Sequence, residues 1–215
     1  MGKSTFLADG QLDTLDRLKA IAEVEPFYLA GGSAAAYHLG HRRSVDLDLF
    51  STTLAVDLEA VRAALVDSLP GFSVLAQSDA ALSARTDATL VDLVRYRYPT
   101  LDPPTPGPRD FPVAGLRDLA AMKLAAIGKR GIRRDFWDLY EIVHAGVDLA
   151  DALRGYLQKF GVAEANLYHV LRALTYFGDA EQEPVFPDGL TRARWDEICA
   201  FFVARAPSLV SAISE

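Results

Sequence analysis

The spacing of apolar residues in the first half of the chain alternates between helical and extended periods. Apolar side chains recur every three or four positions in residues 9–24 and 57–69, which predicts two amphipathic helices, the second capped by Asp57. A shorter helix is predicted over residues 34–39, where Ser33 can act as the cap. Apolar or alternating segments predict strands at 27–30, 44–51, 71–77 and 89–98, with a further short strand at 81–86.

A proline-rich segment separates this half from a helical second half. Five prolines fall within residues 99–108, so this segment cannot be a helix or a central strand and is interpreted as a connector. Beyond it, helical periodicity predicts helices at 115–128, 133–145, 148–159, 163–177 and 191–205. The sequence therefore predicts an α/β domain over residues 1–112, followed by a helical domain over residues 113–215.

Composition and charge narrow the function classes. The chain has 215 residues, a net charge of −7 and one cysteine, which excludes an internal disulfide and a cysteine zinc cluster. No apolar run is long enough for a membrane span, and we expect a cytoplasmic protein. Residues 1–115 hold 10 basic and 15 acidic side chains, which disfavours broad binding of duplex DNA but suits divalent cations.

Paired carboxylates are the first candidate for chemistry. On a strand, Asp46 and Asp48 share one face, while Val45, Leu47 and Leu49 are predicted to face the core. Two carboxylates on one face repel each other unless a cation lies between them, and Mg²⁺ prefers such oxygen ligands. The pattern on its own is also typical of the solvent face of an edge strand.

Two further features accompany this pair. Gly31, Gly32 and Ser33 follow an apolar strand and open a helix, an arrangement that presents backbone N–H groups to phosphate oxygens. Asp92 lies within an apolar strand, where an unpaired acid is costly. It therefore either faces solvent or joins Asp46 and Asp48 around a metal ion.

The order of these elements resembles the nucleotidyltransferases of the DNA polymerase β superfamily. That superfamily combines a Gly-Gly or Gly-Ser turn, an Asp-x-Asp strand and a third carboxylate on a later strand. The second half carries Lys123 at the centre of an apolar helix face, where it must reach the rim or meet a buried anion, and Asp135 in the first turn of the next helix. The cations of residues 129–134 suit either a solvated connection or a phosphate-facing edge.

Two blocks of sequence resemble the AbiEii/AbiGii toxin-type nucleotidyltransferases more specifically. They are the block from Tyr28 to Ser51 and the block from Asp118 to Tyr140, within a resemblance that covers residues 10–145. The resemblance implies a polymerase β-like nucleotidyltransferase fold, of class α/β (α+β), with a small mixed sheet flanked by helices and a helical C-terminal bundle. It also implies an antitoxin protein as a partner.

The expected activity is transfer of a nucleoside monophosphate from a nucleoside triphosphate (NTP) to an acceptor hydroxyl, such as an RNA or tRNA end. Asp46, Asp48 and Asp92 would bind two Mg²⁺ (or Mn²⁺) ions, and Asp92 would help to deprotonate the acceptor. Gly31, Gly32, Ser33, Lys123 and Asp135 are the expected nucleotide-binding residues. The alternatives are an NTP-binding regulatory module without turnover, and a protein or small-molecule hydroxyl as the acceptor; Arg42 and Arg43, with the basic run, favour RNA.

Overall fold

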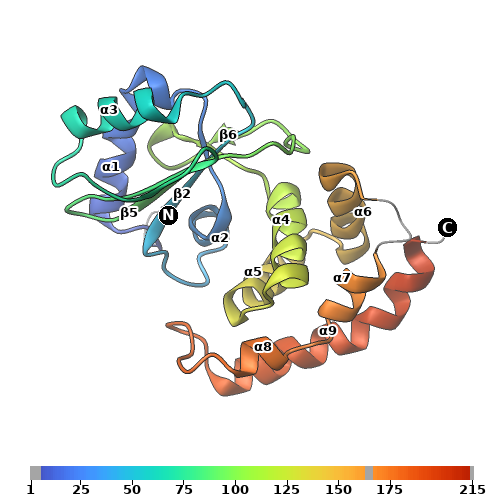
Figure 1. Ribbon diagram of the computed structural model, residues 1–215. Coiled ribbons are helices and arrows are strands. Elements are labelled where there is room, and N and C mark those ends of the chain that lie inside the picture. Colours follow the sequence, from blue (N-terminus) through green and yellow to red (C-terminus); the bar gives the residue numbers. More distant parts are fainter. Residues whose placement is uncertain (1–5, 163–166, 214–215) are drawn as a thin grey trace. The chain divides into compact units, whose positions relative to one another are not determined.

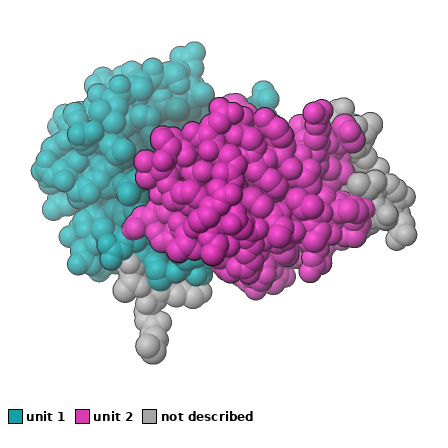
Figure 2. Space-filling view, turned by 90° about the horizontal axis from the view of Figure 1, so that it is seen from below, with its two compact units in different colours: residues 1–115 teal, residues 116–215 magenta. Residues whose placement is uncertain are grey.

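The chain divides into two compact units, residues 1–115 and 116–215 (Figure 2). The computed structural model describes residues 6–162 and 167–213, with side chains of the last helix described through Leu209. The sequence places the domain boundary after residue 112, whereas the first unit extends through β7 (Pro112–Val113), because this strand pairs with β1 of the same sheet. Each unit is described by itself below.

The first unit is built on a seven-stranded mixed sheet in the order β3-β4-β5-β2-β1-β7-β6. The pairs β2/β5 and β1/β7 are parallel, and the remaining neighbours are antiparallel. The strands besides β7 are β1 (Tyr28–Leu29), β2 (Asp46–Ser51), β3 (Ser73–Gln77), β4 (Ala81–Arg85), β5 (Leu90–Arg95) and β6 (Thr105–Pro106). The predicted mixed sheet is confirmed, including the short strand at 81–86.

Helices cover both faces of this sheet (Figure 1). On one face lie α1 (Asp9–Lys19), η2 (Ala22–Val24) and α3 (Leu58–Ser68), and on the other lies α2 (Gly31–Leu39). Asp57 caps α3 as predicted, since its carboxylate accepts hydrogen bonds from the N–H groups of Glu59 and Ala60. Leu15, Leu47 and Leu49 are fully buried in the core of this unit.

Two expectations for the first unit are corrected, and a third is refined. The predicted helix at 9–24 ends at Lys19, and a separate 3-10 turn follows. Val45 is 69% exposed rather than buried, because β2 begins only at Asp46 and the preceding residue is not held in the strand alternation. The proline-rich connector contributes β6, which pairs with β7 at the sheet edge, a position where proline is tolerated.

The second unit is helical throughout the part that the structure describes. Its helices are α4 (Leu116–Lys129), α5 (Arg133–His144), α6 (Leu149–Phe160), α7 (Tyr168–Ala173), α8 (Gly178–Glu181) and α9 (Arg192–Ile213). The helix predicted at 163–177 begins outside the described residues and ends early, at Ala173. The last helix continues past the predicted end at 205, through Pro207. None of the described helices combines the length and the apolar stretch that a membrane span requires.

Aromatic side chains form the centre of the second unit. The ring of Phe136 lies 5.1 Å from Phe177, 5.8 Å from Trp195 and 5.7 Å from Phe202, measured between centroids. Phe136, Trp137 and Tyr140 are buried, so these rings pack in the core of the unit.

Candidate active site

Asp46, Asp48 and Asp92 lie on one face of the sheet. Asp46 and Asp48 alternate along β2 with the buried Leu47 and Leu49. In the parallel pair β2/β5, Asp92 is the direct partner of Asp48, so their side chains leave the sheet on the same side. The structure therefore places Asp92 beside the Asp-x-Asp pair, and the hydrogen bonds of the Asp48 carboxylate to the first N–H groups of α2 identify this face as the one that α2 covers.

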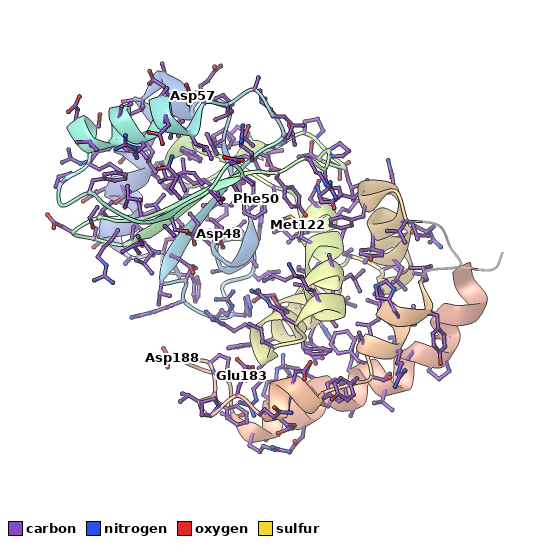
Figure 3. All side chains as sticks on the ribbon, viewed as in Figure 1. Asp48, Phe50, Asp57, Met122, Glu183 and Asp188 are labelled. Carbon is purple, nitrogen blue, oxygen red and sulfur yellow. The ribbon has the colours of Figure 1, made fainter. Side chains whose placement is uncertain are left out.

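The Asp48 carboxylate is held at the N-terminus of α2. Its Oδ2 accepts a 2.7 Å hydrogen bond from the Gly32 N–H and a 3.4 Å hydrogen bond from the Ser33 N–H. A helix N-terminus favours a negative charge, because its first N–H groups lack partners within the helix. Two of the three N–H groups predicted to bind phosphate, those of Gly32 and Ser33, are thus occupied by Asp48 in this structure (Figure 3 labels Asp48).

Ser33 has a different role from the predicted helix cap. The helix begins at Gly31 with Ala30 at the cap position, so Ser33 lies within the first turn. Its fully buried hydroxyl donates to the Ala30 carbonyl at 3.2 Å and accepts from the Asp48 N–H at 3.0 Å. Ser33 therefore ties the start of α2 to β2 at the position of the Asp48 backbone.

Close approach of side chains leaves little room for a Cβ at the two glycines of the turn. Gly31 has a φ of +54°, and a Cβ there would lie 2.4 Å from the Asp48 Oδ2. At Gly32 a Cβ would lie 2.8 Å from Nη2 of Arg42. Sequence reasoning assigned Arg42 only to RNA, but the structure buries it, 8% exposed, against this turn, with Nη1 donating to the Arg43 carbonyl at 3.2 Å.

Replacing Ser33 with alanine is expected to destabilise the first unit. The Asp48 N–H would lose its buried acceptor, so we expect the free energy of unfolding to fall by about 1–3 kcal/mol. Urea denaturation measures this, with Ser73→Ala on the exposed strand β3 as the matched control, which should change stability by at most about 0.5 kcal/mol. Equal stability of Ser33→Ala and wild type would contradict the role assigned to Ser33.

The donor set on this face fits a divalent cation that prefers oxygen ligands. Oδ1 of Asp46 accepts a 2.9 Å hydrogen bond from the Ser44 hydroxyl. The Asp92 carboxylate makes no hydrogen bond or ion pair with any residue in 6–162 or 167–213, although Asp92 is half-buried in an apolar strand. Within the same ranges, no three His, Cys, Asp or Glu side chains are grouped closely enough to hold a metal ion.

Lys123 and Asp135 meet in a buried ion-pair network of the second unit. The Lys123 Nζ lies 3.2 Å from Oδ1 of Asp135 and 2.6 Å from Oδ2 of Asp138, and both carboxylates are fully buried. Arg130 also binds Asp135, through Nε at 2.9 Å and Nη2 at 3.1 Å. Of the two interpretations of Lys123, the structure supports the buried anion. Sequence reasoning missed Asp138, although its position three residues after Asp135 places both on one helix face.

The basic run at 129–134 is not a uniform phosphate-facing edge. Besides Arg130, which binds Asp135, Arg133 is buried, with its guanidinium 4.0 Å above the Phe186 ring and Nη1 donating to the Glu183 carbonyl at 2.8 Å. Lys129 and Arg134 are exposed. Half of the run is therefore committed to contacts within the second unit.

Comparison with known proteins places the chain in a family. The model of the family "Nucleotidyl transferase AbiEii toxin, Type IV TA system" matches residues 75–212, a range that includes Asp92 and Lys123 but not Asp48. The uncharacterized protein aq_aa25 of Aquifex aeolicus (strain VF5) is 31% identical over 195 residues, covering 89% of this chain and 92% of the relative.

A solved structure supports the fold. The structure of MenT4, nucleotidyltransferase toxin Rv2826c from Mycobacterium tuberculosis H37Rv, is similar with a TM-score of 0.58 at 18% identity, covering 95% of this chain and 91% of that one. Both the mixed sheet with its helical second unit and the resemblance seen in the sequence are thereby confirmed. The chain belongs to the AbiEii family of nucleotidyltransferases, the toxins of type IV toxin–antitoxin systems.

Proposed function

We propose that this protein transfers a nucleoside monophosphate from an NTP to a hydroxyl of an RNA acceptor, and that Asp46, Asp48 and Asp92 perform the transfer. The observation that carries the proposal is the pairing of Asp48 with Asp92 across two parallel strands, with Asp46 on the same face. This arrangement brings three carboxylates to one face of the sheet, and one of them, Asp48, accepts hydrogen bonds from N–H groups at the N-terminus of α2.

Each carboxylate has a distinct role in the proposed reaction. Asp46 and Asp48 hold Mg²⁺, which when bound offsets negative charge on the triphosphate. Asp92, whose carboxylate makes no hydrogen bond or ion pair with a described residue, accepts the proton of the acceptor hydroxyl. The hydroxyl oxygen then bonds to the α-phosphorus, and the bond to the leaving pyrophosphate breaks.

The glycine turn would bind the phosphates. The N–H groups of Gly31, Gly32 and Ser33 are the predicted donors, and two of them are bonded to Asp48 in this structure. Phosphate binding there requires Asp48 to turn from these N–H groups toward the cation. The predicted contribution of Lys123 and Asp135 to nucleotide binding stays a prediction, and a stability-restored variant described in the Discussion tests it.

RNA is the preferred acceptor class because exposed cations remain available for phosphate contacts. Arg43 in the first unit, and Lys129 and Arg134 in the second, are solvent-exposed. A protein or small-molecule hydroxyl is the competing acceptor, and an antitoxin protein is the proposed regulatory partner.

Transfer from labelled NTPs tests the function. We expect label from α-³²P-NTP, but not from γ-³²P-NTP, to appear in RNA, and EDTA to abolish the transfer. Transfer of the γ-phosphate would indicate a kinase-like reaction, and binding without transfer would favour a regulatory module. Sequencing of small RNAs after incubation with each NTP identifies the acceptor end, and unmodified RNA with all four NTPs would contradict an RNA acceptor.

A further inference from the structure

Aromatic side chains extend the carboxylate face of the sheet beyond Asp48 and Asp92. Phe50 follows Asp48 by two residues on β2, so the two side chains leave the strand on the same side (Figure 3). Tyr96 follows Asp92 by four residues, and its N–H donates to the Ser51 carbonyl at 2.7 Å, which continues the parallel pairing of the two strands. Phe50 and Tyr96 therefore share the face that carries the acids.

The rings form a continuous cluster with a cation beside it. The ring centroids of Phe50 and Tyr96 are 4.8 Å apart, and those of Tyr96 and Tyr98 are 5.2 Å apart. The Arg97 guanidinium lies 5.0 Å from the centroid of the Tyr98 ring, and its Nη2 donates to the Tyr98 hydroxyl at 3.0 Å. We call Phe50, Tyr96 and Tyr98 the aromatic platform.

The aromatic platform differs from the aromatic core of the second unit. Phe136 and Trp195 in that core are fully buried, as expected for side chains that only pack. The three rings of the platform are half-buried and Arg97 is exposed. Half-buried rings next to an arginine are the combination that proteins use to stack unpaired nucleobases and to bind the neighbouring phosphate.

The spacing along the strands allows one substrate to reach both the carboxylates and the aromatic platform. At a rise of about 3.3 Å per residue, the Cα of Phe50 lies about 7 Å from that of Asp48, and that of Tyr96 lies about 13 Å from that of Asp92. A base stacked on the platform would thus lie within a nucleotide or two of a group that reacts at the carboxylates.

We propose that the aromatic platform binds an unpaired nucleobase of the substrate, with Arg97 close to its phosphate. The proposal rests on the proposed function, because the carboxylates of that reaction share the same sheet face. The base belongs either to the RNA acceptor or to the NTP, and the chemistry of recognition is the same for both.

Binding of ligands with and without bases tests the platform. For the RNA acceptor, fluorescence anisotropy measures the dissociation constants of a short single-stranded RNA and of an abasic strand of equal length. For the incoming nucleotide, the KM for NTPs is compared with inhibition by inorganic tripolyphosphate, which has no base. The variants are Tyr96→Leu and Phe50→Leu, with Tyr96→Phe as the conservative replacement. Tyr168→Leu, at a tyrosine that is 73% exposed in the second unit, is the matched control.

The expected result is selective for the base. Tyr96→Leu should weaken binding of the base-bearing ligand by about 10-fold and leave binding of the abasic strand and of tripolyphosphate unchanged. Tyr96→Phe, which keeps the ring, should bind the base-bearing ligand as wild type does. Weaker RNA binding assigns the platform to the acceptor, and a higher KM for NTPs assigns it to the incoming nucleotide. Equal weakening of ligands with and without bases, or no change in any ligand, would overturn the proposal.

A second measurement covers the case in which the leucine variants do not fold. Ultraviolet crosslinking of wild-type protein to RNA or NTP carrying 4-thiouridine should yield a modified peptide that contains Tyr96 or Tyr98, and crosslinks found only elsewhere would overturn the platform. Failure of the proposed function can be distinguished from failure of the aromatic platform. A protein that transfers no NMP but binds RNA through its bases and Tyr96 retains the platform, whereas an active enzyme that is indifferent to Tyr96 and Phe50 retains only the transfer activity.

Discussion

Asp48→Asn is expected to lower the rate of NMP transfer by about 10²–10⁴-fold, and Asp46→Asn by a similar factor. The amide keeps the size of the carboxylate but loses the charge that a divalent cation requires. Its oxygen can still accept from the Gly32 N–H, so the helix start remains held and the free energy of unfolding should change by at most about 1 kcal/mol. Transfer of α-label at saturating NTP and Mg²⁺ measures the rate, and thermal denaturation measures the stability.

Asp79→Asn is the matched control for this experiment. Asp79 is an exposed acid of the same unit, at the turn between β3 and β4, and its loss should leave the rate within about twofold of wild type. Asp92→Asn should also lower the rate strongly, because Asp92 is the proposed proton acceptor. Full activity of either Asp46→Asn or Asp48→Asn would refute the assignment of the site.

Lys123→Met is expected to be among the most destabilising single substitutions in the second unit. It removes a cation from two fully buried carboxylates, of which Asp135 keeps its ion pair with Arg130. Breaking a buried ion pair from one side costs about 3–5 kcal/mol, and we expect a loss of this size in urea denaturation. Lys129→Met, at an exposed position of the same helix, should cost at most about 0.5 kcal/mol.

A compensating substitution separates stability from nucleotide binding. Asp138→Asn removes one of the two buried charges, so the double variant with Lys123→Met should recover a measurable part of the lost stability. If Lys123 also neutralises the triphosphate, the double variant should still show a raised KM for NTP. A wild-type KM in the recovered protein would restrict Lys123 to a structural role, and a double variant no more stable than Lys123→Met would contradict the network.

Strand alternation was enough to predict the carboxylate face. Side chains alternate between the two faces of a strand, so Asp46 and Asp48 must lie on one face if Leu47 and Leu49 face the core. The position of Asp92 was open, because the register of a parallel pair depends on partners that are distant in the sequence. Only the pairing of Asp48 with Asp92 places the third acid beside the first two.

Contacts between distant segments also explain what the sequence did not reveal. Serine is a residue type that often caps helices, which is why Ser33 was predicted to be a cap. The carboxylate that occupies the N-terminus of α2 instead comes from Asp48, 16 residues beyond Gly32. Val45 has the right polarity for the core, yet it lies one residue before the strand begins. Local propensity does not predict either arrangement, because both depend on where β2 begins and on how it pairs with the rest of the sheet.

The parallel pairing of β2 with β5 has a consequence for how activity is acquired during folding. The segment between Asp48 and Asp92 forms α3, β3 and β4 before β5 returns to lie beside β2. Closing such a long loop is slow relative to forming local helices and hairpins, and the contact cannot form before β5 itself has left the ribosome. A nascent or truncated chain that ends before β5 would carry the Asp-x-Asp motif without its third carboxylate, so catalytic competence would arise late, as a property of the completed sheet.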